Sequence, residues 1–168
     1  ASLLVVFILW YNCISMKKAV IFKSLLGTTE KYARTLGEKI DGDVYRWYIV
    51  NDRGLAQYDL VVICSGPYDD WEPLAEFIET HWTVLKDQKV IVVAVGEIPD
   101  KEGAGWKPHE KIPEAMAKQI KIFELPGKLN PETADEVKME NVDVVVEYIK
   151  EIEDNDGAGK TEEKETAS

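Results

Sequence analysis

Runs of consecutive apolar residues alternate along this chain with segments whose apolar residues recur every three or four positions. The runs predict strands buried on both faces of a sheet, and the three-to-four-residue repeat predicts helices with one buried face. Five strands are predicted, the first beginning at Lys18 and the others over 43–50, 58–65, 89–95 and 120–125. Helices are predicted from the turn at 27–29 to Ile40 and over 72–85, 111–119 and 142–153.

The regular alternation of strand and helix indicates an α/β fold. Right-handed crossovers between parallel strands place helices on both faces, which gives a three-layer, doubly wound architecture. For a five-stranded parallel sheet in the order 2-1-3-4-5, ligands bind between the carboxyl ends of the first and third strands. The turns that begin at Ser24 and Ser65 should therefore meet at one site.

The ends of the chain differ in composition from its middle. Residues 1–15 are apolar and nearly uncharged, but they are too few for a membrane helix, which needs about 20 residues. We expect them to be an extension outside the core, with Met16 as the start of the domain; a peripheral hydrophobic anchor is the alternative. The domain is predicted over 16–153, and an acidic tail over 154–168 is predicted to be disordered because it lacks large apolar residues.

The chain has a net charge of −11, which excludes the electrostatic attraction that nucleic-acid binding requires. Six acids and two lysines from Glu153 to Ser168 supply −4 of it, so the body of the domain is also acidic. Cys13 and Cys64 are the only cysteines, and Cys64 lies in an apolar run, which predicts a reduced, buried thiol. A cytoplasmic location is expected.

The turn after the first strand combines hydroxyl side chains with a glycine at the start of a helix. Hydroxyls donate hydrogen bonds, the glycine allows close approach of the backbone, and the N-terminus of a helix favours an anion. The pattern predicts a phosphate-binding loop; the alternative is an ordinary helix capped by Thr28 or Thr29. The loop residues are Ser24, Leu25, Leu26, Gly27, Thr28 and Thr29.

This turn and its place in the fold resemble the flavodoxin-like family, whose members hold FMN at this crevice. The resemblance covers about 16–153. The phosphate loop of the family usually reads Thr/Ser-x-Thr-Gly-x-Thr, and this chain matches at Ser24, Gly27 and Thr29. Leu26 departs from it, because an alkyl group replaces a hydroxyl that would bind phosphate.

Two further loops occupy the positions of the flavin loops in this family. The segment after the third strand is similar to the branch that contains menaquinone-dependent protoporphyrinogen oxidases, although the acidic segment 127–137 departs from the basic one usual there. Aromatic rings can cover the faces of a flavin ring, and backbone N–H groups can reach its edge; proline lacks that N–H and stiffens the loop. The resemblance implies FMN contacts by Ser65, Gly66, Pro67, Tyr68, Asp69, Trp71, Gly96 and Trp106.

The resemblance implies an FMN-binding redox protein that transfers electrons at low potential, because nearby acids disfavour the anionic reduced flavin. Its acidic surface favours redox partner proteins with basic surfaces, and membrane contact is expected only if residues 1–15 are a genuine anchor. No catalytic residue and no metal site are predicted, and His81 is interpreted as structural. Two alternatives stay open: a binding or regulatory module that has lost FMN, and an FMN-dependent oxidase or quinone reductase.

Overall fold

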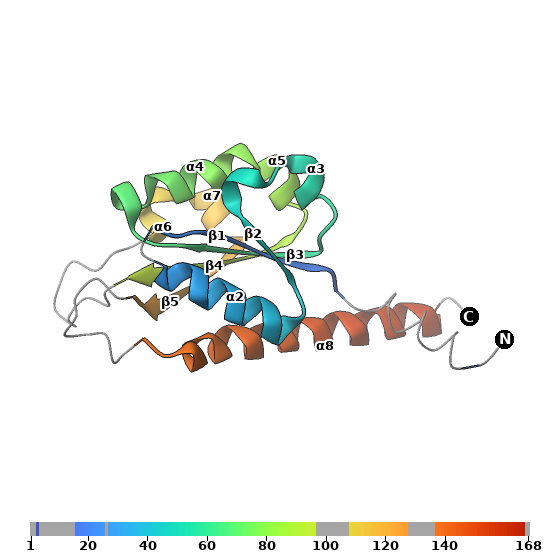
Figure 1. Ribbon diagram of the computed structural model, residues 1–168. Coiled ribbons are helices and arrows are strands. Elements are labelled where there is room, and N and C mark those ends of the chain that lie inside the picture. Colours follow the sequence, from blue (N-terminus) through green and yellow to red (C-terminus); the bar gives the residue numbers. More distant parts are fainter. Residues whose placement is uncertain (1–2, 4–15, 26, 97–107, 128–136, 167–168) are drawn as a thin grey trace.

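The computed structural model describes residues 3, 16–25, 27–96, 108–127 and 137–166. Five parallel strands form one sheet in the order β2-β1-β3-β4-β5, as predicted, with helices on both faces (Figure 1). The strands are β1 (Lys18–Lys23), β2 (Asp43–Arg46), β3 (Leu60–Ser65), β4 (Lys89–Gly96) and β5 (Ile120–Pro126).

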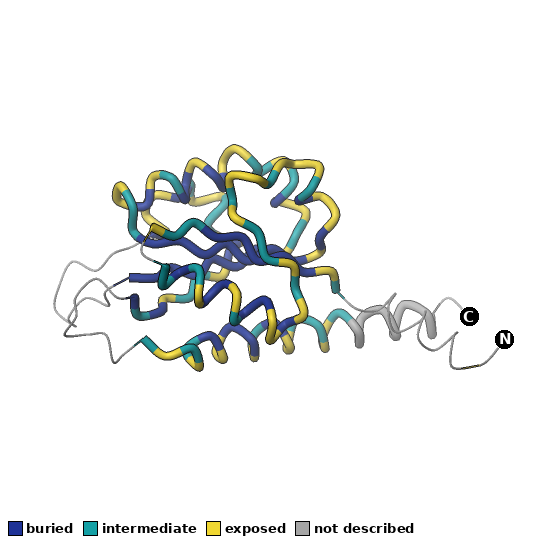
Figure 2. Tube along the Cα trace, viewed as in Figure 1, coloured by how far each residue is buried: buried dark blue, intermediate teal, exposed yellow. Residues whose placement is uncertain are grey.

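The three central strands are buried on both faces, and the two edge strands are only partly covered (Figure 2). β1 pairs with β3 from Lys18 opposite Leu60 to Lys23 opposite Ser65. This register puts the loops that follow Lys23 and Ser65 side by side at the carboxyl edge of the sheet.

One face of the sheet is covered by α2 (Thr28–Ile40) and α8 (Asp143–Thr166) (Figure 1). The apolar face of α2 buries Tyr32, Leu36 and Ile40 against the strands. An ion pair between Lys39 and Asp143 (2.5 Å) joins the two helices at their surface. Burial of this apolar face holds α2 against the sheet, and its start follows the end of β1 after a short loop.

The other face is covered by α3 (Asp52–Leu55), α4 (Glu72–Thr80), α5 (Trp82–Leu85), α6 (Pro108–Lys111) and α7 (Glu114–Ala117). Two 3₁₀ helices, η1 (Trp47–Ile49) and η2 (Tyr68–Trp71), precede α3 and α4. The β2–β3 connection therefore has only two short helical turns where a doubly wound fold generally has a full crossover helix.

Three of the predicted elements end early or are interrupted. The strand predicted over 43–50 ends at Arg46, where pairing with β1 stops, and Trp47 instead stacks on Phe77 with ring centroids 5.1 Å apart. The helix predicted over 72–85 breaks at His81, whose backbone leaves the helical region. The helix predicted over 111–119 is split by Pro113, which has no N–H and disfavours helix at the residue before it.

The tail that we predicted to be disordered from residue 154 is instead part of α8, which continues to Thr166. Extending a helix that is already nucleated adds one hydrogen bond per residue, which allows α8 to continue although Gly157 and Gly159 have low helix propensity. In the part of the chain that the structure describes, no helix has the length and apolarity needed to cross a membrane.

Cys64 is buried in β3, and desolvation raises the pKa of its thiol to about 12. In a Cys13→Ser variant, Cys64 should therefore resist a thiol reagent at pH 8 and react fully in denaturant. Because an unfolded thiol ionises near pH ~8.5, this group should also lower the free energy of unfolding as pH rises from about 9 toward 12. Fast labelling of the native protein would contradict the buried position.

Candidate flavin site

The loop between β1 and α2 has the shape of an anion-binding turn. Gly27 adopts a left-handed conformation (φ 91°) directly before α2, and its N–H donates to Ser24 Oγ at 3.0 Å. No side chain caps α2, and the first helical hydrogen bond runs from the N–H of Lys31 to the carbonyl of Gly27. Thr28 and Thr29 therefore do not act as N-caps, and the N–H groups of the first helical residues face the loop.

The second predicted loop meets the first. Tyr68, in η2, accepts a hydrogen bond at its hydroxyl from the N–H of Leu25 at 3.0 Å. The Tyr68 ring also covers Gly66, where an added Cβ would lie 2.8 Å from the ring. The two loops that sequence spacing placed at one site are thus in direct contact.

The second loop carries three consecutive non-glycine residues in the left-handed region: Asp69 (φ 46°), Asp70 (φ 55°) and Trp71 (φ 68°). Such conformations are unfavourable for L-residues and persist where the surroundings hold them. The Trp71 side chain is only 2% exposed, and Asp70 pairs with Lys111 of α6 at 2.9 Å. Asp70 also raises the pKa of the Lys111 ammonium. A buried ring and an ion pair thus anchor the strained segment.

The burial of Trp71 corrects one prediction. Its ring packs in the core with Leu74 and Ile78, so it does not offer a face to a flavin. Ser65 is also buried, and its hydroxyl donates to the carbonyl of Gly66 at 2.9 Å. Of the side chains predicted to cover a ring face, Tyr68 is the described one that remains at the site. Trp106, and Leu26 of the phosphate loop, lie outside the described residues.

Gly96, the first residue of the third predicted loop, lies at the end of β4 beside the end of β5, whereas residues 97–107 lie outside the described residues. The N–H of Gly127 donates to the carbonyl of Gly96 at 2.7 Å, and a Cβ on Gly127 would lie 3.0 Å from the Gly96 backbone. Gly96 therefore lies at the carboxyl edge of the sheet, as predicted, with its carbonyl already bonded. The hydroxyl of Tyr32 donates to the carbonyl of Pro126 at 2.7 Å beside it.

The loop between β1 and α2 fits the phosphate of FMN. A Cβ added at Gly27 would meet no atom of the described residues within 4 Å, so none of these residues fills the space beside the turn. The hydroxyl of Ser24, although it accepts the Gly27 N–H, keeps its own proton to donate. Thr28 is half-buried at the start of α2, whereas Thr29 is 3% exposed and belongs to the core side of the helix.

Sequence reasoning missed two residues beside the second loop. The Lys23 ammonium lies 5.2 Å from the centroid of the Trp47 ring and 5.9 Å from that of Tyr68. Trp47 was assigned to a strand, and Lys23 was passed over as a polar end of β1. The available signal was a cation at the end of an otherwise apolar strand, immediately before the phosphate loop.

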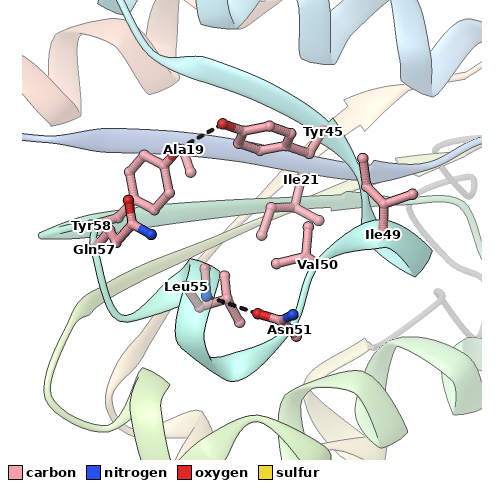
Figure 3. A pocket seen from close by; sticks show the side chains of 10 residues that line it. Ala19, Ile21, Tyr45, Ile49, Val50, Asn51, Leu55, Gln57 and Tyr58 are labelled. Atoms are coloured by element: carbon pink, nitrogen blue, oxygen red, sulfur yellow. Dashed lines mark hydrogen bonds between the residues drawn. The ribbon is translucent and has the colours of Figure 1, made fainter.

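Two hollows lie on the sheet face that carries α3 and α4. One of about 300 Å³ lies under η1 and α3, lined by Ile21, Tyr45 and Leu55 among others (Figure 3). The other, of about 370 Å³, is bordered by Lys23 and Trp47. The lining of these two hollows does not include residues 24–29. The first hollow reflects the short β2–β3 connection.

His81 contacts both α3 and α4. His81 Nδ1 lies 2.6 Å from Asp52 Oδ1, and its ring packs on Phe77 with centroids 4.5 Å apart, in agreement with a structural role. Within the described ranges, no group of three or more His, Cys, Asp or Glu could hold a metal ion. What the geometry offers is a place for a nucleotide phosphate beside an aromatic loop.

Fold and site together define a doubly wound α/β protein with a phosphate loop at the switch point of its sheet. A family model described as "Flavodoxin domain" matches residues 19–155. The chain therefore belongs to the flavodoxin domain family, whose flavodoxins are FMN-binding electron carriers. No curated protein sequence matches it closely enough to count as a relative.

Solved structures of three flavodoxins share the fold. A flavodoxin from the domain Archaea is 18% identical, with a TM-score of 0.53 over 80% of this chain and 99% of that one. Oxidised flavodoxin 2 from Bacillus cereus is 19% identical, with a TM-score of 0.54 over 80% and 99%. Two-electron reduced Megasphaera elsdenii flavodoxin is 15% identical, with a TM-score of 0.51 over 74% and 95%. At these identities the likeness concerns the fold.

Proposed function

We propose that this chain binds FMN and transfers electrons at low potential between redox partner proteins. The observation that carries the proposal is the contact between the two predicted flavin loops, in which the Leu25 N–H and the Tyr68 hydroxyl lie 3.0 Å apart. A turn suited to phosphate and an aromatic side chain suited to a ring are thereby held within reach of one ligand.

In this proposal the phosphate is held by the Ser24 and Thr28 hydroxyls and by the first N–H groups of α2. Tyr68 covers one face of the ring, and N–H groups of Gly66, Tyr68 and Asp69 serve its edge. FMN, when bound, supplies the one- or two-electron chemistry, so no protein nucleophile or acid–base pair is needed. The chain positions the cofactor and sets its electrostatic surroundings.

The net charge of −11 supports both the low potential and partners with basic surfaces, since acids disfavour an anionic ring and attract cationic proteins. Asp69 is exposed at the loop, whereas Asp70 is paired with Lys111, so its effect is partly neutralised. A cytoplasmic location, the domain limits of 16–153 and a relation to the protoporphyrinogen oxidase branch remain predictions from the sequence.

One observation favours the alternative of a module without FMN. Ser24 Oγ accepts the N–H of Gly27, so one donor of the phosphate loop is satisfied by the protein itself. Purified protein separates the two functions. We expect FMN to bind tightly, with flavin absorbance that acid precipitation releases and with a low midpoint potential in a redox titration. Protein that stays colourless in an FMN titration would support the alternative.

Thr28→Ala is expected to weaken FMN binding by about 1 kcal/mol, because the variant loses one hydroxyl that donates to the phosphate. The measurement is a fluorescence titration of apoprotein with FMN. Thr28→Ser keeps the hydroxyl and serves as the control. We leave Thr29 unchanged because it is buried and its replacement would disturb the core. Unchanged affinity in Thr28→Ala would indicate that the phosphate does not contact this side chain.

A further inference from the structure

We propose that Lys23 is a positioning residue that raises the reduction potential of the bound flavin, partly offsetting the acidic surroundings. Its ammonium group would stabilise the negative charge of the reduced ring and hold the aromatic loop in place. This inference rests on the proposed function, because it requires FMN at the site.

The position of Lys23 supports this role. It is the last residue of β1, immediately before the phosphate loop, and it pairs in register with Ser65 at the start of the second loop. Its ammonium lies 5.9 Å from the centroid of the Tyr68 ring, and the hydroxyl of that ring bonds to the phosphate loop. One cation is therefore placed where the backbone of both flavin loops begins.

A stack of side chains holds the ammonium in place. Lys23 lies 5.2 Å from the Trp47 ring centroid, and Trp47 stacks on Phe77 with an angle of 7° between their planes. Cation–π contacts with Trp47 and Tyr68 attract the ammonium to this position. Glu76 lines the same hollow as Lys23, but no carboxylate among residues 16–25, 27–96, 108–127 and 137–166 forms an ion pair with the Lys23 ammonium.

The sign of the effect follows from the charge of the ring. Oxidised FMN has a neutral ring, and uptake of two electrons and one proton gives an anionic one. A nearby ammonium lowers the free energy of the anionic ring and leaves that of the neutral ring nearly unchanged. Because Lys23 borders an open hollow, water screens part of this attraction. The expected effect is therefore moderate.

The test compares Lys23→Met, which keeps an unbranched side chain one atom shorter and loses its charge, with Lys23→Arg, which keeps the charge. Kd for FMN is measured for the oxidised and the dithionite-reduced cofactor. In Lys23→Met we expect the Kd of reduced FMN to rise about tenfold relative to that of oxidised FMN, which a two-electron couple reports as a potential lower by about 30 mV. Lys23→Arg should retain the wild-type ratio.

Lys118→Met is the matched control. Lys118 precedes β5, at the opposite edge of the sheet, and its side chain is 73% exposed. Lys118→Met removes the same unit of charge as Lys23→Met, but at a position away from the proposed site. It should therefore leave the ratio of the Kd of reduced FMN to that of oxidised FMN unchanged. An unchanged ratio of the two Kd values in Lys23→Met would overturn the inference. If both Kd values also rose equally, Lys23 would be assigned to the phosphate. Wild-type protein that binds no FMN would overturn the proposed function and the inference with it.

Discussion

Gly27→Ala is expected to raise the Kd of FMN by about ten- to a hundredfold, or about 1.4–2.8 kcal/mol. Gly27 adopts φ 91°, a conformation that costs an L-residue about 1–2 kcal/mol. An alanine would relax toward negative φ and reshape the turn that precedes α2. Its Cβ would also point into the space next to this turn, where the proposal places the phosphate. Strain and steric exclusion therefore act in the same direction on FMN binding.

The experiment titrates folded apoprotein with FMN and separately measures the free energy of unfolding, so that strain and ligand contact are distinguished. Leu25→Ala is the control in the same loop. The Leu25 side chain is 69% exposed, and its backbone N–H is retained in the variant, so we expect unchanged affinity. If Leu25→Ala weakened FMN as much as Gly27→Ala, side chains rather than the backbone turn would govern binding.

Gly37→Ala is expected to lower the free energy of unfolding by about 1–2 kcal/mol, although helix propensity alone predicts the opposite. Replacing glycine by alanine within a helix generally gains about 1 kcal/mol. Gly37 lies in α2 against β2, however, and an added Cβ would be 2.2 Å from Val44 Cγ2. A β-branched side chain has few alternative rotamers, so the clash must move the backbone, at a cost of about 1–3 kcal/mol. We expect the clash to dominate.

A double-mutant cycle isolates this contact. In a Val44→Ala background the obstructing methyl group is absent, and Gly37→Ala should then stabilise the protein by about 0.5–1 kcal/mol through helix propensity. Urea denaturation of the four proteins gives the coupling free energy. Stabilisation by Gly37→Ala in the wild-type background would mean that α2 and β2 are farther apart than the structure places them.

The phosphate loop could be predicted because its properties are local. A strand, a glycine that reaches positive φ and the start of an amphipathic helix are adjacent in sequence, and the alternation of elements then places the Ser65 loop beside it. The assignment of Trp71 was wrong because loop composition does not reveal which way a ring points; three left-handed residues turn this one into the core. Contacts of Lys23 with Trp47 and Tyr68 join three separate segments, and no local pattern contains them.

By itself, the sequence determined the five strands, their order and the meeting of two loops at the carboxyl edge, because periodic burial and short connections permit few other arrangements. Only the tertiary structure decided which side chains face the flavin site. It buried Trp71, brought the Tyr68 hydroxyl to the Leu25 N–H and placed the Lys23 ammonium beside that ring. These choices depend on packing between residues distant in sequence, and such packing can hold backbone conformations that local propensity disfavours, such as those of Asp69, Asp70 and Trp71.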